Sequence, residues 1–316
     1  MSKAKNVLVT GGAGFIGSHL VDRLISLGHR VAVVDDLSTG RRENLDRRAA
    51  FYQVDVASSA VMEVFQQERP EAVFHLAAQS SVSVSVREPA VDAGTNVLGA
   101  IRVLEAAQRF GTRKIVYTST GGALYGEPER LPCDELHPIR PLAPYGTSKY
   151  VGELYVGLFH RLYGLDYTIL RYGNVYGPRQ DPHGEAGVIA IFGALMLAGK
   201  QPTINGTGEQ ERDFVFVSDV VEANALAMER GSGQAFNIGS GVGASVVRIF
   251  ELLRQATGYR GGPVYGAALP GEVFKIYLDS SLARQELGWR PRVSLEEGLR
   301  LTVDHLRREA QLQGAS

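Results

Sequence analysis

The sequence predicts an α/β protein with a doubly wound parallel sheet and a smaller C-terminal α/β lobe. Through the first half of the 316-residue chain, strand-like apolar runs alternate with helix-like stretches. Repeated strand–helix units of this kind build a parallel sheet that helices cover on both faces. From about Gly173 the alternation stops, and a polar, turn-rich loop follows at residues 178–184. We therefore expect the lobe to begin there.

The first strand–helix–strand unit spans residues 6–35. Residues 6–9 form an apolar run of strand length, a glycine-rich turn follows at residues 10–17, and residues 30–34 form a second strand that ends at Asp35. Gly28, just before that strand, suits a helix C-cap. The helical spacing between the strands is carried by Ile16, Leu20, Val21, Leu24 and Leu27.

This unit is typical of a Rossmann dinucleotide-binding site. Its glycines allow a tight turn, leave room for a pyrophosphate and let helix and strand pack closely, while the helix N-terminus offers N–H groups to phosphates. Asp35 can accept hydrogen bonds from a ribose diol and would repel a 2′-phosphate, which favours NAD over NADP. Arg41 and Arg42 argue the other way but lie past the strand end. The alternative is a glycine turn that serves packing only.

The later elements follow from the same patterns. Strands are expected at 51–54, 72–76, 114–118 and 166–170, and helices at 58–67, 90–110 and 145–163. In the lobe, strands are expected near 202–204 and 213–217, and helices near 281–287 and 295–312. The chain then divides into a dinucleotide-binding domain, residues 1–172, and a discontinuous lobe, residues 173–316, with the segment 214–258 returning to the first domain.

The composition argues against several kinds of protein. A net charge of −1 gives no general drive toward nucleic acid or anionic membrane. The longest apolar run, residues 188–198, is shorter than a membrane span. Cys133 is the only cysteine, so no intrachain disulfide is expected and a reducing, cytoplasmic location fits. The 7 histidines show no paired ligand spacing, so no metal site is predicted.

Tyr145 and Lys149 stand four residues apart, on one face of a predicted helix. A nearby ammonium stabilises phenolate, so the sequence predicts that the pKa of Tyr145 is lowered toward neutrality. Such a tyrosine can take the proton of a substrate hydroxyl while hydride leaves the same carbon. The same spacing also occurs on ordinary helix faces, but beside the glycine turn it indicates catalysis.

With these residues the chain resembles the extended short-chain dehydrogenase/reductases and, within them, the UDP-glucose 4-epimerases. The resemblance covers nearly the whole chain. It rests on the Tyr145 and Lys149 pair and on residues 10–17, 35–40, 75–79, 171–178, 212–215 and 270–273. Together these stretches are specific for nucleotide-sugar enzymes and less specific for the 4-epimerase branch.

The resemblance implies a reaction at C4 of a UDP-hexose. Tyr145 takes the proton from the sugar O4, NAD takes hydride from C4, and hydride then returns to the other face of the 4-keto sugar. Lys149 holds the nicotinamide ribose, Asn174 and Arg212 grip the diphosphate, and residues 173–316 form a UDP-sugar-binding lobe. The implied catalytic residues are Tyr145, Lys149 and Thr120. The implied cofactor-binding residues are Gly11, Gly14, Phe15, Ile16, Gly17, Asp35, Asp36, Leu37, Ser38, Thr39, Gly40, Asp55, Val56, Leu76, Ala77, Ala78, Gln79, Asn96, Thr118, Tyr145, Lys149 and Tyr172. The implied substrate-binding residues are Ser119, Thr120, Gly121, Tyr145, Asn174, Val188, Thr203, Asn205, Arg212 and Glu272. For each, a structural role at a strand end or loop is the alternative.

Three positions depart from the family's pattern. Gly121 stands where a serine or threonine is usual, and Thr120 is the favoured replacement, with Ser119 as runner-up. Leu269 stands where an arginine is common, and Asn205 where an aromatic residue is common. A further position, Ile276, aligns with the family's gate beside the sugar. It is smaller than tyrosine, so an N-acetyl group is expected to fit.

Related functions stay open. UDP-GlcNAc and UDP-glucuronate 4-epimerases are the nearest alternatives. The 4,6-dehydratases and decarboxylases want acidic residues just after the catalytic hydroxyl, where this chain has Gly121, Gly122 and Ala123. An NAD-binding sensor would not need Tyr145 and Lys149. By resemblance, the helices near 90–110 and 145–163 are expected to pair across a homodimer as a four-helix bundle.

Overall fold

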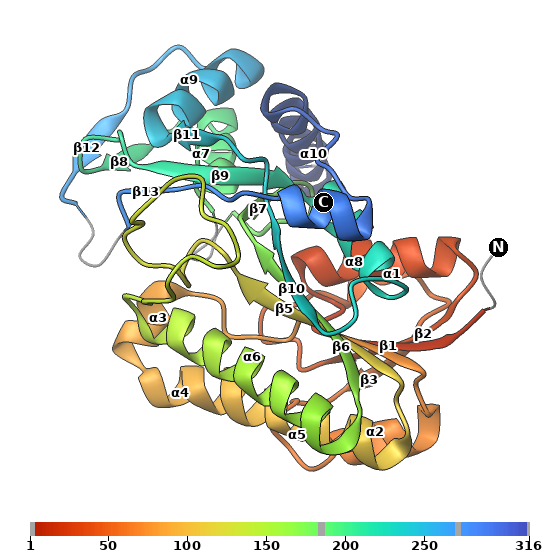
Figure 1. The fold of residues 1–316 in the computed structure, drawn as a ribbon. Coiled ribbons are helices and arrows are strands. Elements are labelled where there is room, and N and C mark those ends of the chain that lie inside the picture. The colour runs from red at the N-terminus through yellow and green to blue at the C-terminus, as the bar shows by residue number, and fades with distance from the viewer. Residues whose placement is uncertain (1–3, 183–186, 269–272, 315–316) are drawn as a thin grey trace.

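The computed structural model describes residues 4–182, 187–268 and 273–314. Its centre is a parallel sheet of seven strands in the spatial order β10-β6-β5-β4-β1-β2-β3 (Figure 1). The order changes direction at β1, which lies between β4 and β2, so the predicted doubly wound sheet is confirmed. The strands are β1 (Asn6–Thr10), β2 (Arg30–Asp35), β3 (Ala50–Gln53), β4 (Ala72–His75), β5 (Lys114–Thr120), β6 (Asp166–Tyr172) and β10 (Gln234–Ile238).

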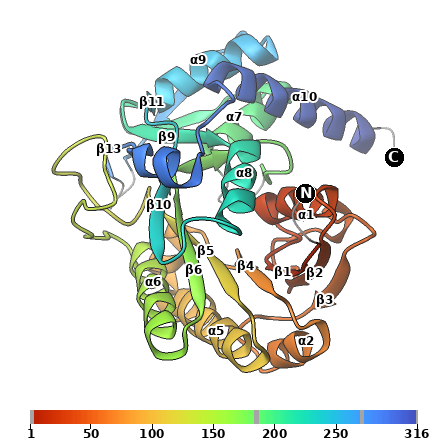
Figure 2. The ribbon, with the colours of Figure 1, turned by 45° about the vertical axis from the view of Figure 1, so that its right-hand side comes forward.

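Helices cover both faces of this sheet (Figures 1 and 2). On one face lie α1 (Phe15–Ser26) and α8 (Val217–Ala227), and on the other lie α2 (Val61–Glu68), α5 (Gly99–Phe110) and α6 (Pro144–Tyr163). Successive side chains of a strand point to opposite faces, so β1 sends Val7 and Val9 into one core and Leu8 into the other. Burial on both faces explains why the inner strands β1, β2 and β4 are mainly apolar.

One continuous helical stretch leads into α5. It consists of α4 (Pro89–Ala93), a π-helical turn (Gly94–Leu98) and α5, and the separate short helix α3 (Val82–Arg87) precedes it. The predicted helix at 90–110 is therefore present, with one widened turn. Such turns are frequent at functional sites, and this one carries the buried Asn96. A short 3-10 turn (Arg42–Asn44) lies between β2 and β3.

A smaller unit begins just beyond the carboxyl end of β6. Its sheet is centred on β9 (Glu211–Phe216), which pairs with β7 (Asn174–Tyr176), β11 (Gly243–Ser245) and β13 (Lys275–Ile276). The helices α7 (Val188–Leu197), α9 (Val246–Thr257) and α10 (Leu295–Gly314) pack on one another beside it. A separate ribbon pairs β8 (Thr203–Asn205) with β12 (Val264–Gly266), and a π-helical turn (Ala283–Leu287) precedes α10.

The chain crosses between the two units repeatedly. Of the predicted returning segment 214–258, α8 packs on α1 and β10 pairs with β6, so residues 217–238 lie with the large sheet. The strand β11 then pairs with β9, and α9 packs on α7 and α10. The return therefore ends earlier than predicted, because the glycine-rich turn after β10 sends the chain back to the small sheet.

Asp213 holds this crossing in place. Its buried carboxylate accepts hydrogen bonds from the N–H groups of Ser240, Gly241 and Leu278 and from the Ser240 hydroxyl. Burial raises the pKa of Asp213, while these donors favour the charged form. The carboxylate thus joins β9 to the turn after β10 and to the segment after β13.

Candidate active site

The glycine turn after β1 is packed tightly against the end of β4. Gly11 has a φ of +68°, which favours glycine, and a Cβ there would lie 2.6 Å from the Ala77 nitrogen. A Cβ on Gly17 would collide with the Gly11 carbonyl. In contrast, the space outside Gly14, at the start of α1, is open apart from the Gly11 carbonyl at 3.2 Å. Phe15 and Ile16 follow in the first turn of α1 and are half-buried.

Asp35 organises the loop at the end of β2. Its carboxylate accepts the Ala13 N–H at 2.9 Å and the Leu37 N–H at 2.9 Å. Burial raises the pKa of Asp35, and the two amides act in the opposite direction. A Cβ on Gly40 would lie 2.7 Å from this carboxylate, so the loop folds closely around it. The rest of the predicted stretch, Asp36, Ser38 and Thr39, lies on the outside of this loop, where Asp36 accepts the Ser38 N–H.

These features fit a bound dinucleotide. The open backbone at Gly14 and the N-terminus of α1 offer room and N–H groups for phosphates. The carboxylate of Asp35 lies at the carboxyl end of the neighbouring strand, where a ribose is expected. Val56 is buried and packs against Gly99. Asp55 is exposed, and its carboxylate accepts the Ala57 N–H of its own turn.

Asn96 anchors the loop that follows β4. Its side chain accepts the Gln79 N–H and donates to the Gln79 carbonyl, to Asp92 and to the Ser148 hydroxyl. At the start of the same loop the Ala77 N–H donates to the Thr10 hydroxyl. The predicted residues Leu76, Ala77, Ala78 and Gln79 therefore lie in a loop tied to β1, to the π-helical turn and to α6. The side-chain oxygen and nitrogen of Asn96 are both hydrogen-bonded to other residues of the protein. The role of Asn96 in this structure is therefore to support the loop.

Tyr145 and Lys149 come from the first two turns of α6, which begins at Pro144. Lys149 is buried, and its Nζ lies 4.7 Å from the centre of the Tyr117 ring. Burial lowers the pKa of Lys149 to about 8, against the charges of Glu153 and Asp92, which raise it. Burial and Asp92 raise the pKa of Tyr145 to about 12, and a hydrogen bond with Thr120 acts in the opposite direction. The predicted lowering of the pKa of Tyr145 is therefore wrong for this structure, because burial, the largest cause of the shift, favours the neutral phenol.

Two acidic residues near this pair were not foreseen. Asp92 is buried in α4, its Oδ1 accepts from Gln79 and Asn96, and its Oδ2 has no partner among the described residues. No sequence signal places it there, since its proximity depends on how α4 packs against α6. Glu153 could have been found, because it follows Lys149 by four residues on the same helix face.

The end of β5 presents three hydroxyls. The Thr118 hydroxyl lies 3.2 Å from the Tyr172 hydroxyl, which also accepts from the buried Asn224. Thr120 contacts Tyr145 and accepts the Ala123 N–H at 3.2 Å. The Ser119 hydroxyl is buried and has no partner in the part of the chain that the structure describes.

Asn174 lies at the same turn. A Cβ on Gly122 would lie 3.3 Å from the Asn174 Oδ1 and 4.0 Å from the Thr120 Oγ1, so the two polar side chains flank this glycine. The structure thus brings Thr120, Tyr145 and Asn174 together at the carboxyl ends of β5 and β6. This is the edge at which such sheets bind ligands.

The other predicted substrate residues lie in the small unit. Val188 begins α7, Thr203 and Asn205 lie in β8, and Arg212 lies in β9 next to Ile276 of β13. Arg212 donates to the carbonyls of Glu211 and Phe274. Glu272 and Leu269 lie outside the described residues. Within the described ranges, no group of three or more His, Cys, Asp or Glu side chains could hold a metal ion.

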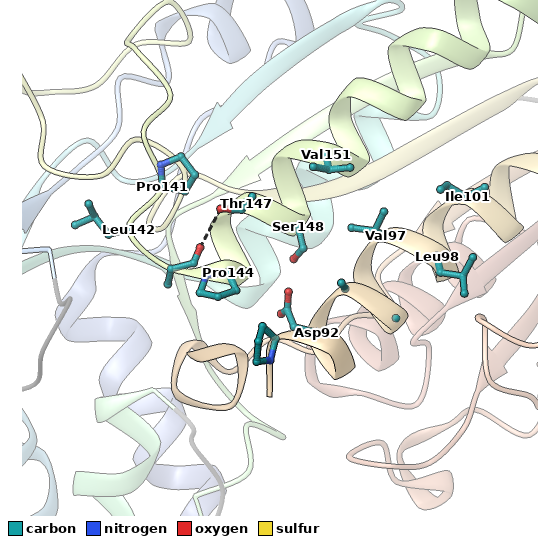
Figure 3. Close-up of a pocket in the computed structure, with 14 residues that line it drawn as sticks. Asp92, Val97, Leu98, Ile101, Pro141, Leu142, Pro144, Thr147, Ser148 and Val151 are labelled. Atoms are coloured by element: carbon teal, nitrogen blue, oxygen red, sulfur yellow. Dashed lines mark hydrogen bonds between the residues drawn. The ribbon is translucent and has the colours of Figure 1, made fainter. Parts of the chain in front are cut away.

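A large hollow lies between α4, the π-helical turn, α5 and the start of α6 (Figure 3). Its lining is mainly apolar and includes Val97, Leu98, Ile101, Leu142 and Val151. Tyr145 and Lys149 do not line it. It is therefore distinct from the turn that carries Thr120.

Comparison with known proteins agrees with this fold, and together they define an NAD-dependent enzyme of the short-chain dehydrogenase/reductase type. Residues 7–239 match the NAD dependent epimerase/dehydratase family, and the chain belongs to that family. It is 53% identical to a UDP-glucose 4-epimerase of Thermotoga maritima solved with UDP-glucose, over 96% of this chain and 99% of that one, with a TM-score of 0.95.

Two further relatives agree with this membership. A Thermus thermophilus UDP-glucose 4-epimerase, solved in complex with NAD, is 44% identical over 95% of this chain and 98% of its own, with a TM-score of 0.91. A UDP-glucose 4-epimerase of Mycolicibacterium smegmatis is 45% identical over 310 residues, which is 96% of this chain and 99% of the relative.

Proposed function

We propose that this protein interconverts UDP-glucose and UDP-galactose by inverting C4 of the hexose. The observation that carries the proposal is the convergence of Tyr145, Lys149 and Thr120 at the carboxyl end of β5, beside an NAD-type glycine turn. A phenol, a buried ammonium and a hydroxyl are what proton transfer at a sugar hydroxyl requires. The Thermotoga maritima relative, solved with UDP-glucose, supports this substrate class.

In this proposal each residue has a separate role. Tyr145 takes the proton from the sugar O4 and later returns it, and Thr120 holds O4 beside that phenol. Lys149 supplies positive charge one turn further along the helix that carries Tyr145. NAD, when bound, supplies reversible hydride acceptance at C4. The residues that would hold it are those of the glycine turn, Asp35 and the loop after β4.

The small unit is proposed to bind the UDP portion of the substrate. Asn174 flanks the same turn as Thr120, and its amide is available to a diphosphate. Arg212 adds a cation in β9, and Thr203 and Asn205 are proposed to lie beside the uridine. In this division the seven-stranded unit serves the cofactor, and the unit around β9 serves the nucleotide sugar.

Other reactions of nucleotide sugars are less well supported. Elimination or decarboxylation wants an acid just after the catalytic hydroxyl, but residues 121–123 are Gly, Gly and Ala. A UDP-GlcNAc or UDP-glucuronate 4-epimerase would use the same residues on a different sugar. An NAD-binding sensor would have no need of a tyrosine and lysine on one helix face.

One assay separates these possibilities. The protein is incubated with UDP-galactose, and any UDP-glucose formed is coupled to UDP-glucose dehydrogenase. We expect NADH formation that is lost in Tyr145→Phe. UDP-galactose recovered unchanged would contradict the proposal. Parallel incubations with UDP-GlcNAc and UDP-glucuronate, analysed by chromatography, identify the sugar if it is a different one.

We also propose a homodimer built on the helices around the hollow of Figure 3. Exposed apolar side chains on these helices include Val91 at 52%, Leu98 at 46%, Leu154 at 53% and Leu162 at 60%. Apolar groups gathered on one face commonly mark an interface. Light scattering at micromolar concentration should give a dimer. Leu98→Glu combined with Leu154→Glu should give a monomer, whereas Val242→Glu, at a still more exposed apolar residue elsewhere, should not.

The location in the cell is a further proposal. A reducing, cytoplasmic compartment fits a single cysteine that is buried. Separately, no helix in the described ranges is long and apolar enough to cross a membrane.

A further inference from the structure

The side chain of Leu278 occupies the space that a side chain at residue 121 would need. A Cβ on Gly121 would lie 2.5 Å from the Leu278 Cδ1 and 2.8 Å from its Cδ2. Gly121 has no positive φ, so its backbone conformation alone would accept another residue. The glycine is therefore required by the volume of Leu278.

Neither residue is free to move away. The Gly121 N–H donates to the Tyr172 carbonyl at 2.7 Å, which fixes the turn to β6. The Leu278 N–H donates to Asp213 at 3.0 Å, and the flanking residues exchange hydrogen bonds with Cys133. The Leu278 side chain is fully buried among Leu124, Tyr125, Val273 and Ile276. Displacing it would disturb this cluster.

The turn after β5 is also held from its other side. Gly146, in the first turns of α6, packs so closely on the Ala123 carbonyl that a Cβ there would collide with it. Residues 121–123 therefore lie between Leu278 and the helix that carries Tyr145 and Lys149.

We propose that Leu278 is a positioning residue that holds this turn and thereby makes Thr120, instead of residue 121, the source of the hydroxyl beside Tyr145. The inference rests on the proposed epimerase function. It couples the small unit, through Asp213 and Leu278, to the geometry of the proton-transfer site on the large sheet.

The first test uses Gly121→Ser alone and together with Leu278→Ala. Gly121→Ser should lower kcat by about tenfold or more and lower Tm, because its Cβ meets Leu278. The double variant with Leu278→Ala should have a kcat at least about fivefold higher than Gly121→Ser alone and should recover part of the lost Tm. The effects of the two substitutions would then be non-additive. Adding Leu104→Ala, at an equally buried leucine in α5, should restore neither kcat nor Tm.

The second test separates positioning from packing. In the parent, Thr120→Val should cost about tenfold in kcat. In the Gly121→Ser, Leu278→Ala background the same change should cost less than about threefold, because the introduced serine hydroxyl takes over, with KM and NAD content unchanged.

Three results would overturn the inference. They are parental kcat and Tm in Gly121→Ser, equal rescue by Leu278→Ala and Leu104→Ala, or an equal cost of Thr120→Val in both backgrounds. A parent protein without epimerase activity would instead refute the proposed function, and the Tm comparison would still decide whether Leu278 excludes a side chain at residue 121.

Discussion

Arg171 of β6 forms a bidentate ion pair with Glu153, which lies one helical turn after Lys149 in α6. The Arg171 Nε lies 3.0 Å from the Glu153 Oε1, and its Nη2 lies 2.7 Å from Oε2. The two side chains are only 7% and 5% exposed. Arg171 also donates to the Tyr125 hydroxyl, so the pair joins β6 and α6 to the loop after β5. The charge of Glu153 raises the pKa of Lys149 against the effect of burial.

Removing the carboxylate should destabilise the fold. Glu153→Gln leaves the Arg171 charge buried without its partner, and the free energy of unfolding should fall by about 3–5 kcal/mol in urea titrations. Glu251→Gln is the control, because the Glu251–Arg254 pair is 40% and 43% exposed. It should change the free energy of unfolding by less than about 1 kcal/mol. Equal effects in the two variants would contradict the expectation.

Activity should depend on the protonation of Lys149. Burial lowers its pKa to about 8, so the side chain is charged below about pH 8 and neutral above it. The proposed role needs the charged form, and kcat should therefore fall as pH rises through this value. Lys149→Arg keeps its charge at all accessible pH values. Its residual kcat should show no fall between pH 7 and pH 9.5, about 1–1.5 units on either side of the pKa of Lys149. An identical fall in both proteins would assign the titration to another group.

Thr120→Val should lower kcat by at least about tenfold while leaving NAD content unchanged, because general acid–base groups contribute about that much or more. Ser119→Ala should do less. Thr120 already contacts Tyr145, whereas the Ser119 hydroxyl is buried without a partner among the described residues. Near-parental activity of Thr120→Val together with loss of activity in Ser119→Ala would transfer the role to Ser119.

Ile276 should influence which sugars are accepted. Its side chain is 1% exposed and packs in the cluster that contains Leu278. Ile276→Tyr should reduce UDP-GlcNAc turnover more than UDP-galactose turnover. The ratio of the two turnover rates should change by about 10- to 200-fold. Tm should fall as well, since overpacking a core costs about 1–3 kcal/mol. Equal loss on both sugars would mean that Ile276 does not act as the gate.

Local patterns were enough to predict the large sheet and the cofactor turn. The inner strands β1, β2 and β4 are mainly apolar because both faces are buried. The turn at Gly11 needs glycine for its positive φ and its approach to Ala77. Asp35 could be predicted because its place at the end of β2 follows from the chain order. The spacing of Tyr145 and Lys149 is likewise a local feature of one helix.

What the sequence could not predict depends on contacts between distant segments. Asp92 approaches Tyr145 only because α4 packs on α6, and the raised pKa of Tyr145 reflects its burial in the folded chain. The contact between Gly121 and Leu278 joins residues more than 150 positions apart. The departure at Gly121 was visible in the sequence, but its steric cause was not.

The return of β10 to the large sheet limits how this protein can be re-engineered. The edge strand β10 comes from a segment that lies, in the sequence, between two parts of the small unit. A truncation after β6 would remove β10 and leave β6 with an unpaired edge. A foreign nucleotide-sugar lobe could not be exchanged as a single cassette. It would have to be grafted as separate pieces on either side of residues 217–238, with the Asp213 contacts rebuilt at both junctions.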